Sequence, residues 1–192
     1  NMQNGNALPV SAFVDHADGT VPLGTAAYEK RGVAIDVPVW NPDACLQCNL
    51  CSYVCPHAVI RPVVMDDAAA AKAPGASVAM KGLEGKKFAV SISVLDCTGC
   101  GSCVNVCPEV KGVKALSMTS LDSNLEAQKL FDYGLTLETP AEVLEKFKET
   151  TPKGSQFKQP LLEFSGACAG CGETPYAKLI TQLFGDRMYI SN

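Results

Sequence analysis

The chain has 192 residues, of which 47% are hydrophobic and 19% charged, and this balance predicts one or two globular domains rather than a disordered chain. Its net charge of −4 is spread without a block of like charge, so we expect neither a nucleic-acid partner nor binding to a membrane surface. The start of the sequence lacks the features of a signal peptide and no apolar run approaches the length of a membrane span, which predicts a cytoplasmic protein.

The first part of the chain leads into a repeated pattern of cysteines. Residues 1–42 form a mixed lead-in segment, and Pro38 limits its last, β-branched stretch to an extended or edge conformation. Residues 43–120 contain two similar motifs, CLQCNLCSYVCP and CTGCGSCVNVCP, each followed by an apolar stretch. We interpret the two motifs as an internal repeat. In the insertion between them, Asp66–Lys72 favours a helical turn and Phe88–Asp96 favours a strand.

The last part of the chain is predicted to be mainly helical. Residues 121–160 form a helical linker by composition and periodicity, with one helix over Ser120–Leu135 and a second that Thr139 can cap. Residues 161–192 combine a strand-like stretch, the glycine-rich cysteine loop GACAGCGE and a helix for which Thr174 is the candidate cap.

The spacing C-x-x-C-x-x-C-x-x-x-C-P in both motifs is typical of bacterial proteins with two iron–sulfur clusters, in which the fourth cysteine binds the other cluster. Three thiolates two residues apart can surround one [4Fe–4S] cluster, whereas the fourth points away from it. We therefore expect cluster one on Cys45, Cys48, Cys51 and Cys107, and cluster two on Cys97, Cys100, Cys103 and Cys55. This exchange of ligands ties the two motifs together, so the clusters are expected to support the fold.

Other uses of these eight cysteines were compared with the iron–sulfur interpretation. Zinc ribbons pair one C-x-x-C with another and rarely add two further cysteines in register, although a zinc-stabilised interaction module without a redox role stays open. Disulfides need an oxidising compartment, and haem attachment needs C-x-x-C-H, which is absent from the sequence. His57 is a candidate group beside a cluster, but an ordinary, partly exposed histidine is the simpler interpretation. We interpret Trp40 as a packing residue.

Two further stretches are distinctive, YEKRGVAIDVPVW (Tyr28–Trp40) and FSGACAGCGETPYAKLITQLFGDRMYISN (Phe164–Asn192). Together with the two cysteine motifs, and in this order, they resemble the single-chain pyruvate:ferredoxin (flavodoxin) oxidoreductases. The long insertion between the motifs is also similar, since free-standing ferredoxins have a shorter one. The resemblance covers nearly the whole chain.

The resemblance implies an α+β fold, with a ferredoxin-like domain that holds two [4Fe–4S] clusters and has a long insertion, flanking helices and a partial C-terminal α/β unit. Residues 161–192 would be the truncated start of a thiamine-diphosphate-binding domain. In the intact enzyme, electrons from the oxidative decarboxylation of pyruvate to acetyl-CoA would pass through the clusters to ferredoxin or flavodoxin. Thiamine diphosphate with Mg and a third [4Fe–4S] cluster are implied only for the intact enzyme, which is expected to be a homodimer.

Cys168 and Cys171 match two ligands of the third, proximal cluster of that family. Because no further cysteine of this chain is free to complete the site, we expect no cluster at this pair. The family enzymes are several times longer, which predicts a fragment that transfers electrons, contains no catalytic residue and does not turn over pyruvate alone. The alternative function is a stand-alone electron carrier or a ferredoxin-like subunit of another dehydrogenase. The sequence leaves open the 2-oxoacid, the acceptor and the reduction potentials.

Overall fold

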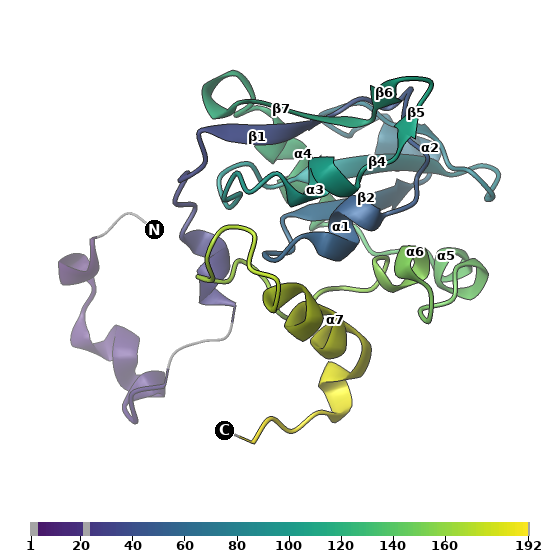
Figure 1. Cartoon of the computed structure of the whole chain (residues 1–192). Coiled ribbons are helices and arrows are strands. Elements are labelled where there is room, and N and C mark those ends of the chain that lie inside the picture. The colour runs from purple at the N-terminus through teal and green to yellow at the C-terminus, as the bar shows by residue number, and fades with distance from the viewer. Residues whose placement is uncertain (1–3, 21–23, 192) are drawn as a thin grey trace.

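Two antiparallel strand pairs form the centre of the protein in the computed structural model (Figure 1). Strand β1 (Asp36–Trp40) pairs with β7 (Leu116–Ser120). Strand β2 (Ile60–Met65) pairs with β4 (Lys87–Ile92), and the short β3 (Val78–Ala79) pairs with the other edge of β4. Each sheet therefore joins the strand before one cysteine motif to the strand after the other motif.

The internal repeat is also visible in the helices that follow the cysteine loops. Helix α1 (Leu50–Val54) begins after Asn49, and α3 (Ser102–Val106) begins after Gly101. Both preceding residues have left-handed backbones, with φ of 61° and 74°. Each helix ends at the fourth cysteine of its motif, which is extended and precedes a proline that cannot continue the helix.

The segments after the two motifs differ. The first motif runs directly into β2, whereas the second is followed by a hairpin of β5 (Glu109–Val110) and β6 (Val113–Lys114) before β7. The helical turn predicted in the insertion is confirmed as α2 (Asp67–Ala70), because Asp66 Oδ1 accepts a 2.7 Å hydrogen bond from the backbone N–H of Ala69. The strand predicted after it is confirmed as β4.

The larger of two hydrophobic clusters lies between the sheets and the cysteine loops. Val37, Phe88 and Val94 are fully buried in it, and the rings of Trp40 and Phe88 meet edge to face with centroids 6.2 Å apart. Burying a side chain of this size stabilises the fold by about 1.5–3 kcal/mol. The packing role predicted for Trp40 is confirmed by this contact.

Short helices follow β7 along the chain. They are η4 (Leu121–Ser123), α4 (Ala127–Gly134), α5 (Ala141–Lys146), α6 (Pro152–Ser155), α7 (Thr174–Phe184) and η5 (Gly185–Arg187). The prediction that Thr139 caps a helix is wrong, because its hydroxyl donates to the carbonyl of Phe157 at 3.0 Å and α5 begins only after Pro140. The cap predicted at Thr174 is also wrong, because this buried residue is the first residue of α7 and Glu173 precedes it.

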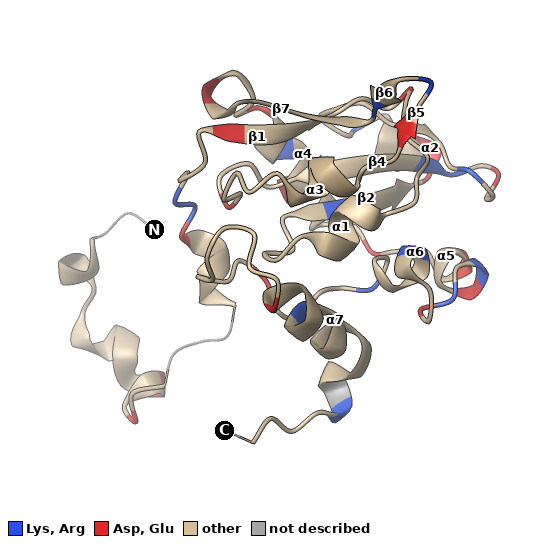
Figure 2. Cartoon of the chain, viewed as in Figure 1, with Lys and Arg blue, Asp and Glu red and all other residues tan. Residues whose placement is uncertain are grey.

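The structure describes residues 4–20 and 24–191, and the first part of the lead-in segment extends away from this body in Figure 1. It contains the 3₁₀ helices η1 (Gly5–Ala7), η2 (Val10–His16) and η3 (Thr25–Tyr28). Across the described ranges, no helix has both the length and the apolar character needed to cross a membrane. Figure 2 shows acidic and basic residues interspersed over the elements that it colours.

Candidate metal centre

The first group of cysteines comes together around a small apolar cavity. Its cysteines are Cys45, Cys48, Cys51 and Cys107, and its apolar lining includes Trp40, Phe88, Val90, Ala115 and Leu116. Three of the cysteines come from the first motif and the fourth comes from the second. These are the four residues that the sequence assigns to cluster one.

The second group lines a separate cavity of the same kind. Its cysteines are Cys55, Cys97, Cys100 and Cys103, and its other lining residues include Pro38, His57, Val59, Ile60 and Met118. Here the second motif provides three cysteines and the first motif provides one. The fold therefore brings together both sets of four residues expected from the spacing, with the fourth cysteines exchanged.

Left-handed residues bend both cysteine loops in the same way. In the second motif these residues are Gly99 and Gly101, with φ of 70° and 74°, and in the first motif Gln47 and Asn49 occupy the equivalent positions, with φ of 57° and 61°. Glycine adopts this conformation without strain, whereas other residues need support. Comparing the two motifs position by position is the signal that reveals the special backbone of Gln47 and Asn49.

Side-chain hydrogen bonds provide that support in the first motif. The buried amide of Gln47 donates to the carbonyl of Ala79 at 2.8 Å and accepts from the backbone N–H of Lys81 at 2.7 Å. Asn49 Nδ2 donates to the carbonyl of Lys153 at 3.0 Å. The first loop is thus held by the insertion and by α6, which are both distant in sequence.

Backbone N–H groups point at equivalent sulfur atoms in the two loops. The N–H of Gln47 donates to Cys45 Sγ at 3.3 Å, and the N–H of Gly99 donates to Cys97 Sγ at 3.4 Å. Such donors stabilise negative charge on sulfur and are among the features that set the potential of an iron–sulfur cluster.

The buried thiols are unfavourable places for charge without a cation. Burial raises the pKa of Cys97 to about 11 and that of Cys103 to about 12, and neighbouring cysteines act in the same direction. Burial and the nearby Cys103 and Cys48 raise the pKa of Cys51 well above its usual range. Since thiolates bind metals, four convergent sulfur donors in a dry cavity fit a cationic sulfur-ligated group.

The structure also bears on the alternatives. All ten cysteines are free, and none forms a disulfide. The donor set, the cavities and the N–H groups fit an iron–sulfur cluster at each group of four.

The late pair of cysteines lies outside both cavities. Cys168 is exposed, and the backbone N–H of Cys171 donates to the carbonyl of Cys168 at 3.1 Å. Hydrogen-bond donors on Thr174 and Glu173 lower the pKa of Cys171. A Cβ placed on Gly170, between the two, would lie 3.6 Å from Cys100 Cβ, so this loop packs against the second motif.

The expectation that His57 is partly exposed is wrong, because this residue is buried and lines the second cavity. Burial lowers its pKa, and the backbone of Ser165 partly opposes this effect. The neutral ring is therefore the favoured form in the interior of the protein.

The lead-in segment is fastened directly to the second motif. Lys30 Nζ lies 2.5 Å from Asp96 Oδ2, next to Cys97, and 4.8 Å from the ring centroid of Phe164. The backbone N–H of Gly32 donates to the carbonyl of Leu95 at 2.8 Å. The Glu-Lys-Arg stretch thus holds the start of the second cysteine loop.

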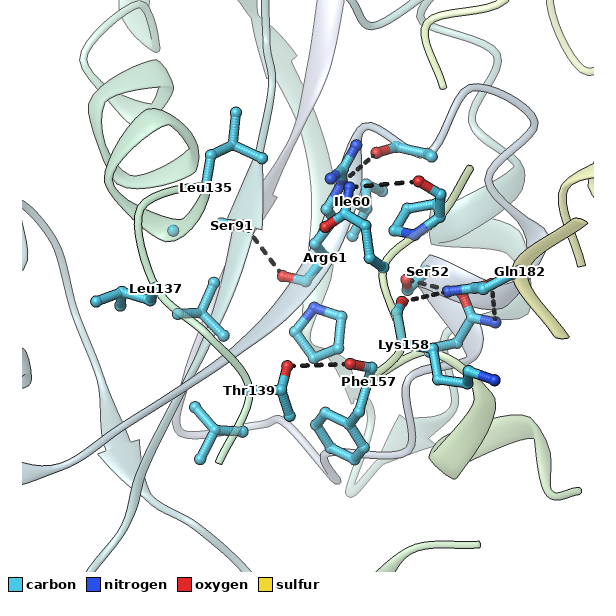
Figure 3. A pocket seen from close by; sticks show the side chains of 18 of the residues that line it. Ser52, Ile60, Arg61, Ser91, Leu135, Leu137, Thr139, Phe157, Lys158 and Gln182 are labelled. Atoms are coloured by element: carbon cyan, nitrogen blue, oxygen red, sulfur yellow. Dashed lines mark hydrogen bonds between the residues drawn. The ribbon is translucent and has the colours of Figure 1, made fainter. Parts of the chain in front are cut away.

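A larger cleft, of about 490 Å³, lies between β2, the segment around Thr139 and α7 (Figure 3). None of the ten cysteines lines this cleft. In Figure 3, Leu135 and Leu137 lie on one side of it and Ser52 and Gln182 on the other. The cleft is therefore separate from the two cysteine-lined cavities.

Comparison with known families agrees with this site. Residues 44–110 match a 4Fe-4S double cluster binding domain, and residues 1–34 match the EKR domain, a domain of unknown function. All eight cysteines of the two cavities lie within the residues that match this double cluster domain.

Comparison with individual proteins extends the similarity over the whole chain. The chain is 56% identical to a pyruvate-flavodoxin oxidoreductase of Klebsiella pneumoniae and 53% identical to a pyruvate:ferredoxin oxidoreductase of Moorella thermoacetica, with 100% of the chain and 16% of each relative covered. It is 50% identical to a pyruvate dehydrogenase [NADP(+)] of Cryptosporidium parvum, with 100% of the chain and 10% of that relative covered. The resemblance to pyruvate:ferredoxin (flavodoxin) oxidoreductases is confirmed, and the chain spans about one sixth of the length of the first two relatives.

Proposed function

We propose that this chain is the electron-transfer segment of a pyruvate (2-oxoacid):ferredoxin or flavodoxin oxidoreductase. The observation that carries the proposal is the grouping of the cysteines, because each cavity combines three cysteines of one motif with the fourth of the other. The similarity of the whole chain to such oxidoreductases supports the same function.

Two [4Fe–4S] clusters are the proposed cofactors. Cys45, Cys48, Cys51 and Cys107 would hold cluster one, and Cys97, Cys100, Cys103 and Cys55 would hold cluster two. When bound, such clusters accept and release single electrons. The chain contributes the sulfur donors, the apolar walls that exclude water, and the N–H groups of Gln47 and Gly99 that stabilise charge on sulfur.

The remaining parts of the chain are proposed to connect this segment to the intact enzyme. The proposed boundaries are a lead-in at 1–42, the two-cluster domain at 43–120, a helical linker at 121–160 and the start of a thiamine-diphosphate domain at 161–192. In the intact, cytoplasmic and homodimeric enzyme, electrons would leave the thiamine-diphosphate site, with its Mg and a third cluster, and reach ferredoxin or flavodoxin. In this chain alone, Cys168 and Cys171 hold no cluster.

Electron transfer by the purified chain tests the proposal. The iron-loaded chain is reduced with dithionite without oxygen, freed of dithionite and mixed with oxidised flavodoxin or ferredoxin. We expect the carrier to be reduced, whereas pyruvate, coenzyme A and thiamine diphosphate without dithionite reduce neither the chain nor the carrier. Reduction driven by pyruvate would show a complete catalytic site in this chain, and failure to reduce either carrier would contradict the electron-transfer role.

A further inference from the structure

Helices α1 and α3, which follow the two cysteine loops, each have a lysine ammonium at their C-terminal end. Lys114 Nζ donates to the carbonyls of Val104, at 2.8 Å, and Asn105, at 3.3 Å. These two residues directly follow Cys103, the third cysteine of the second motif. Lysine side chains near the end of a helix can satisfy carbonyls that lack partners within the helix.

The first motif has the same arrangement at the equivalent residues. Lys178 Nζ donates to the carbonyls of Ser52 and Tyr53, the latter at 3.3 Å, and these residues directly follow Cys51. It also donates to the carbonyl of Cys55 itself, at 3.1 Å. The two lysines therefore bind register-equivalent carbonyls in the two halves of the repeat.

The two lysines come from different parts of the chain. Lys114 lies on the β5–β6 hairpin, which belongs to the second half of the repeat. The first motif runs into β2 without such a hairpin, and its lysine arrives from α7, outside residues 43–120 of the proposed two-cluster domain. Lys178 is only 1% exposed, whereas Lys114 is half-buried.

Hydrogen bonds hold α7 in place around Lys178. Gln182 Nε2 donates to the carbonyl of Lys158 at 2.6 Å, and Gln156 Nε2 donates to Gln182 Oε1 at 3.4 Å. Ser52 Oγ in turn donates to Gln156 Oε1 at 3.1 Å. Figure 3 shows Ser52, Gln182 and Lys158 close together on this side of the cleft.

The three carbonyls around Lys178 Nζ match the donors of its charged form, although burial lowers the pKa of Lys178 to about 8. An ammonium has three N–H donors, which match the three carbonyl acceptors, whereas a neutral amine has only two and leaves one carbonyl without a donor. A buried charge is also screened less by water and salt than an exposed one. The nearby Arg61 adds no comparable free charge, because its guanidinium is paired with Glu163.

We propose that Lys178 raises the reduction potential of the cluster bound by Cys55, Cys97, Cys100 and Cys103, and does so more strongly than Lys114 does for the other cluster. Reduction adds negative charge to a cluster, and a fixed cation beside the backbone of Cys55 favours that charge. Lys114 occupies the equivalent position before Cys107, which belongs to the other cavity, but it is less buried. The C-terminal segment would thereby set the potential of one cluster from outside the double cluster domain.

This inference rests on the two clusters of the proposed function, so iron and sulfide are measured first. Midpoint potentials of the loaded chain are then measured by anaerobic titration, followed by electron paramagnetic resonance and visible absorption. In Lys178→Gln and Lys178→Met, we expect one of the two potentials to fall by at least a tenfold change in the reduction equilibrium, which is about 59 mV for one electron. Lys178→Arg keeps the charge and should return the potential towards that of the original chain.

Two further variants separate charge placement from general effects. Lys114→Met should lower the other potential, by less, and Lys129→Met, which removes an exposed surface charge, should leave both unchanged. Lys178→Gln keeps two N–H donors for the carbonyls, so it is the variant to interpret where Lys178→Met does not retain its iron. Loaded Lys178→Gln with both potentials unchanged would overturn the inference and leave the proposed function intact, whereas an original chain without iron and sulfide would overturn the proposed function itself.

Discussion

The two glycines of the second cysteine loop allow backbone strain to be separated from steric clash. Gly99 and Gly101 have nearly equal φ, 70° and 74°. A Cβ on Gly101 would meet nothing within 4 Å, whereas a Cβ on Gly99 would lie 3.1 Å from the carbonyl oxygen of Asp36 and 3.3 Å from Ala34 Cβ. Asp36 belongs to β1 and Ala34 is buried, so neither neighbour can move freely.

The expected effects follow from these contacts. Gly101→Ala places an ordinary residue in the left-handed region and should destabilise the loaded chain by about 1–2 kcal/mol. Gly99→Ala carries the same strain and adds a packing clash of about 1–3 kcal/mol. With a guanidinium m-value of about 4–6 kcal/mol/M, the clash alone should lower the unfolding midpoint of Gly99→Ala by about 0.2–0.7 M relative to Gly101→Ala.

The difference between the two midpoints is measured by guanidinium unfolding without oxygen. Unfolding is followed by far-ultraviolet circular dichroism and by the visible absorption of the clusters, at equal incubation times. Gly101→Ala is the matched variant, because it controls for the loss of a left-handed glycine without the clash. Equal midpoints for the two variants would refute the claim that Gly99 is required by its close approach to β1.

Three further changes test the site. Cys107→Ser lies in the second motif but should remove the cluster of the first, so that iron per chain falls from about eight to about four; loss of iron from the second cavity instead would contradict the exchanged pairing. Gln47→Leu leaves the carbonyl of Ala79 and the N–H of Lys81 without partners and should cost about 2–4 kcal/mol, measured as a lower guanidinium midpoint. Lys30→Met breaks the partly buried pair with Asp96 and should lower the stability by about 2 kcal/mol. The neighbouring Arg31 forms an exposed pair with Glu29 at 3.4 Å, so Arg31→Met should lower it by less than about 1 kcal/mol. Equal effects of these two substitutions in the same unfolding assay would argue against an anchoring role for Lys30.

Local sequence patterns predicted the features that depend on neighbouring residues. The cysteine spacing predicted which four residues line each cavity, and Asp66 predicted the start of α2. The predicted caps at Thr139 and Thr174 failed because these side chains have other partners or positions in the folded chain. Capping preferences describe a helix in isolation and cannot include such tertiary contacts.

The supporting residues of the site depend on contacts between distant segments. Gln47 binds residues 79 and 81, and Lys178 binds carbonyls of α1 that lie more than a hundred positions earlier. Neither residue has a distinctive local pattern, since a lysine in an amphipathic helix usually faces solvent. Their roles become apparent only when the two halves of the repeat are compared in the folded chain.

The most direct test of the central claim is the content of iron, acid-labile sulfide and zinc per chain, on protein purified without oxygen. Two four-iron clusters on the eight central cysteines predict about eight iron and eight sulfide per chain, with Cys168 and Cys171 empty. About ten to twelve iron would mean that the late pair recruits a cluster and would contradict that part of the account. Zinc without sulfide would contradict the iron–sulfur assignment of both cavities.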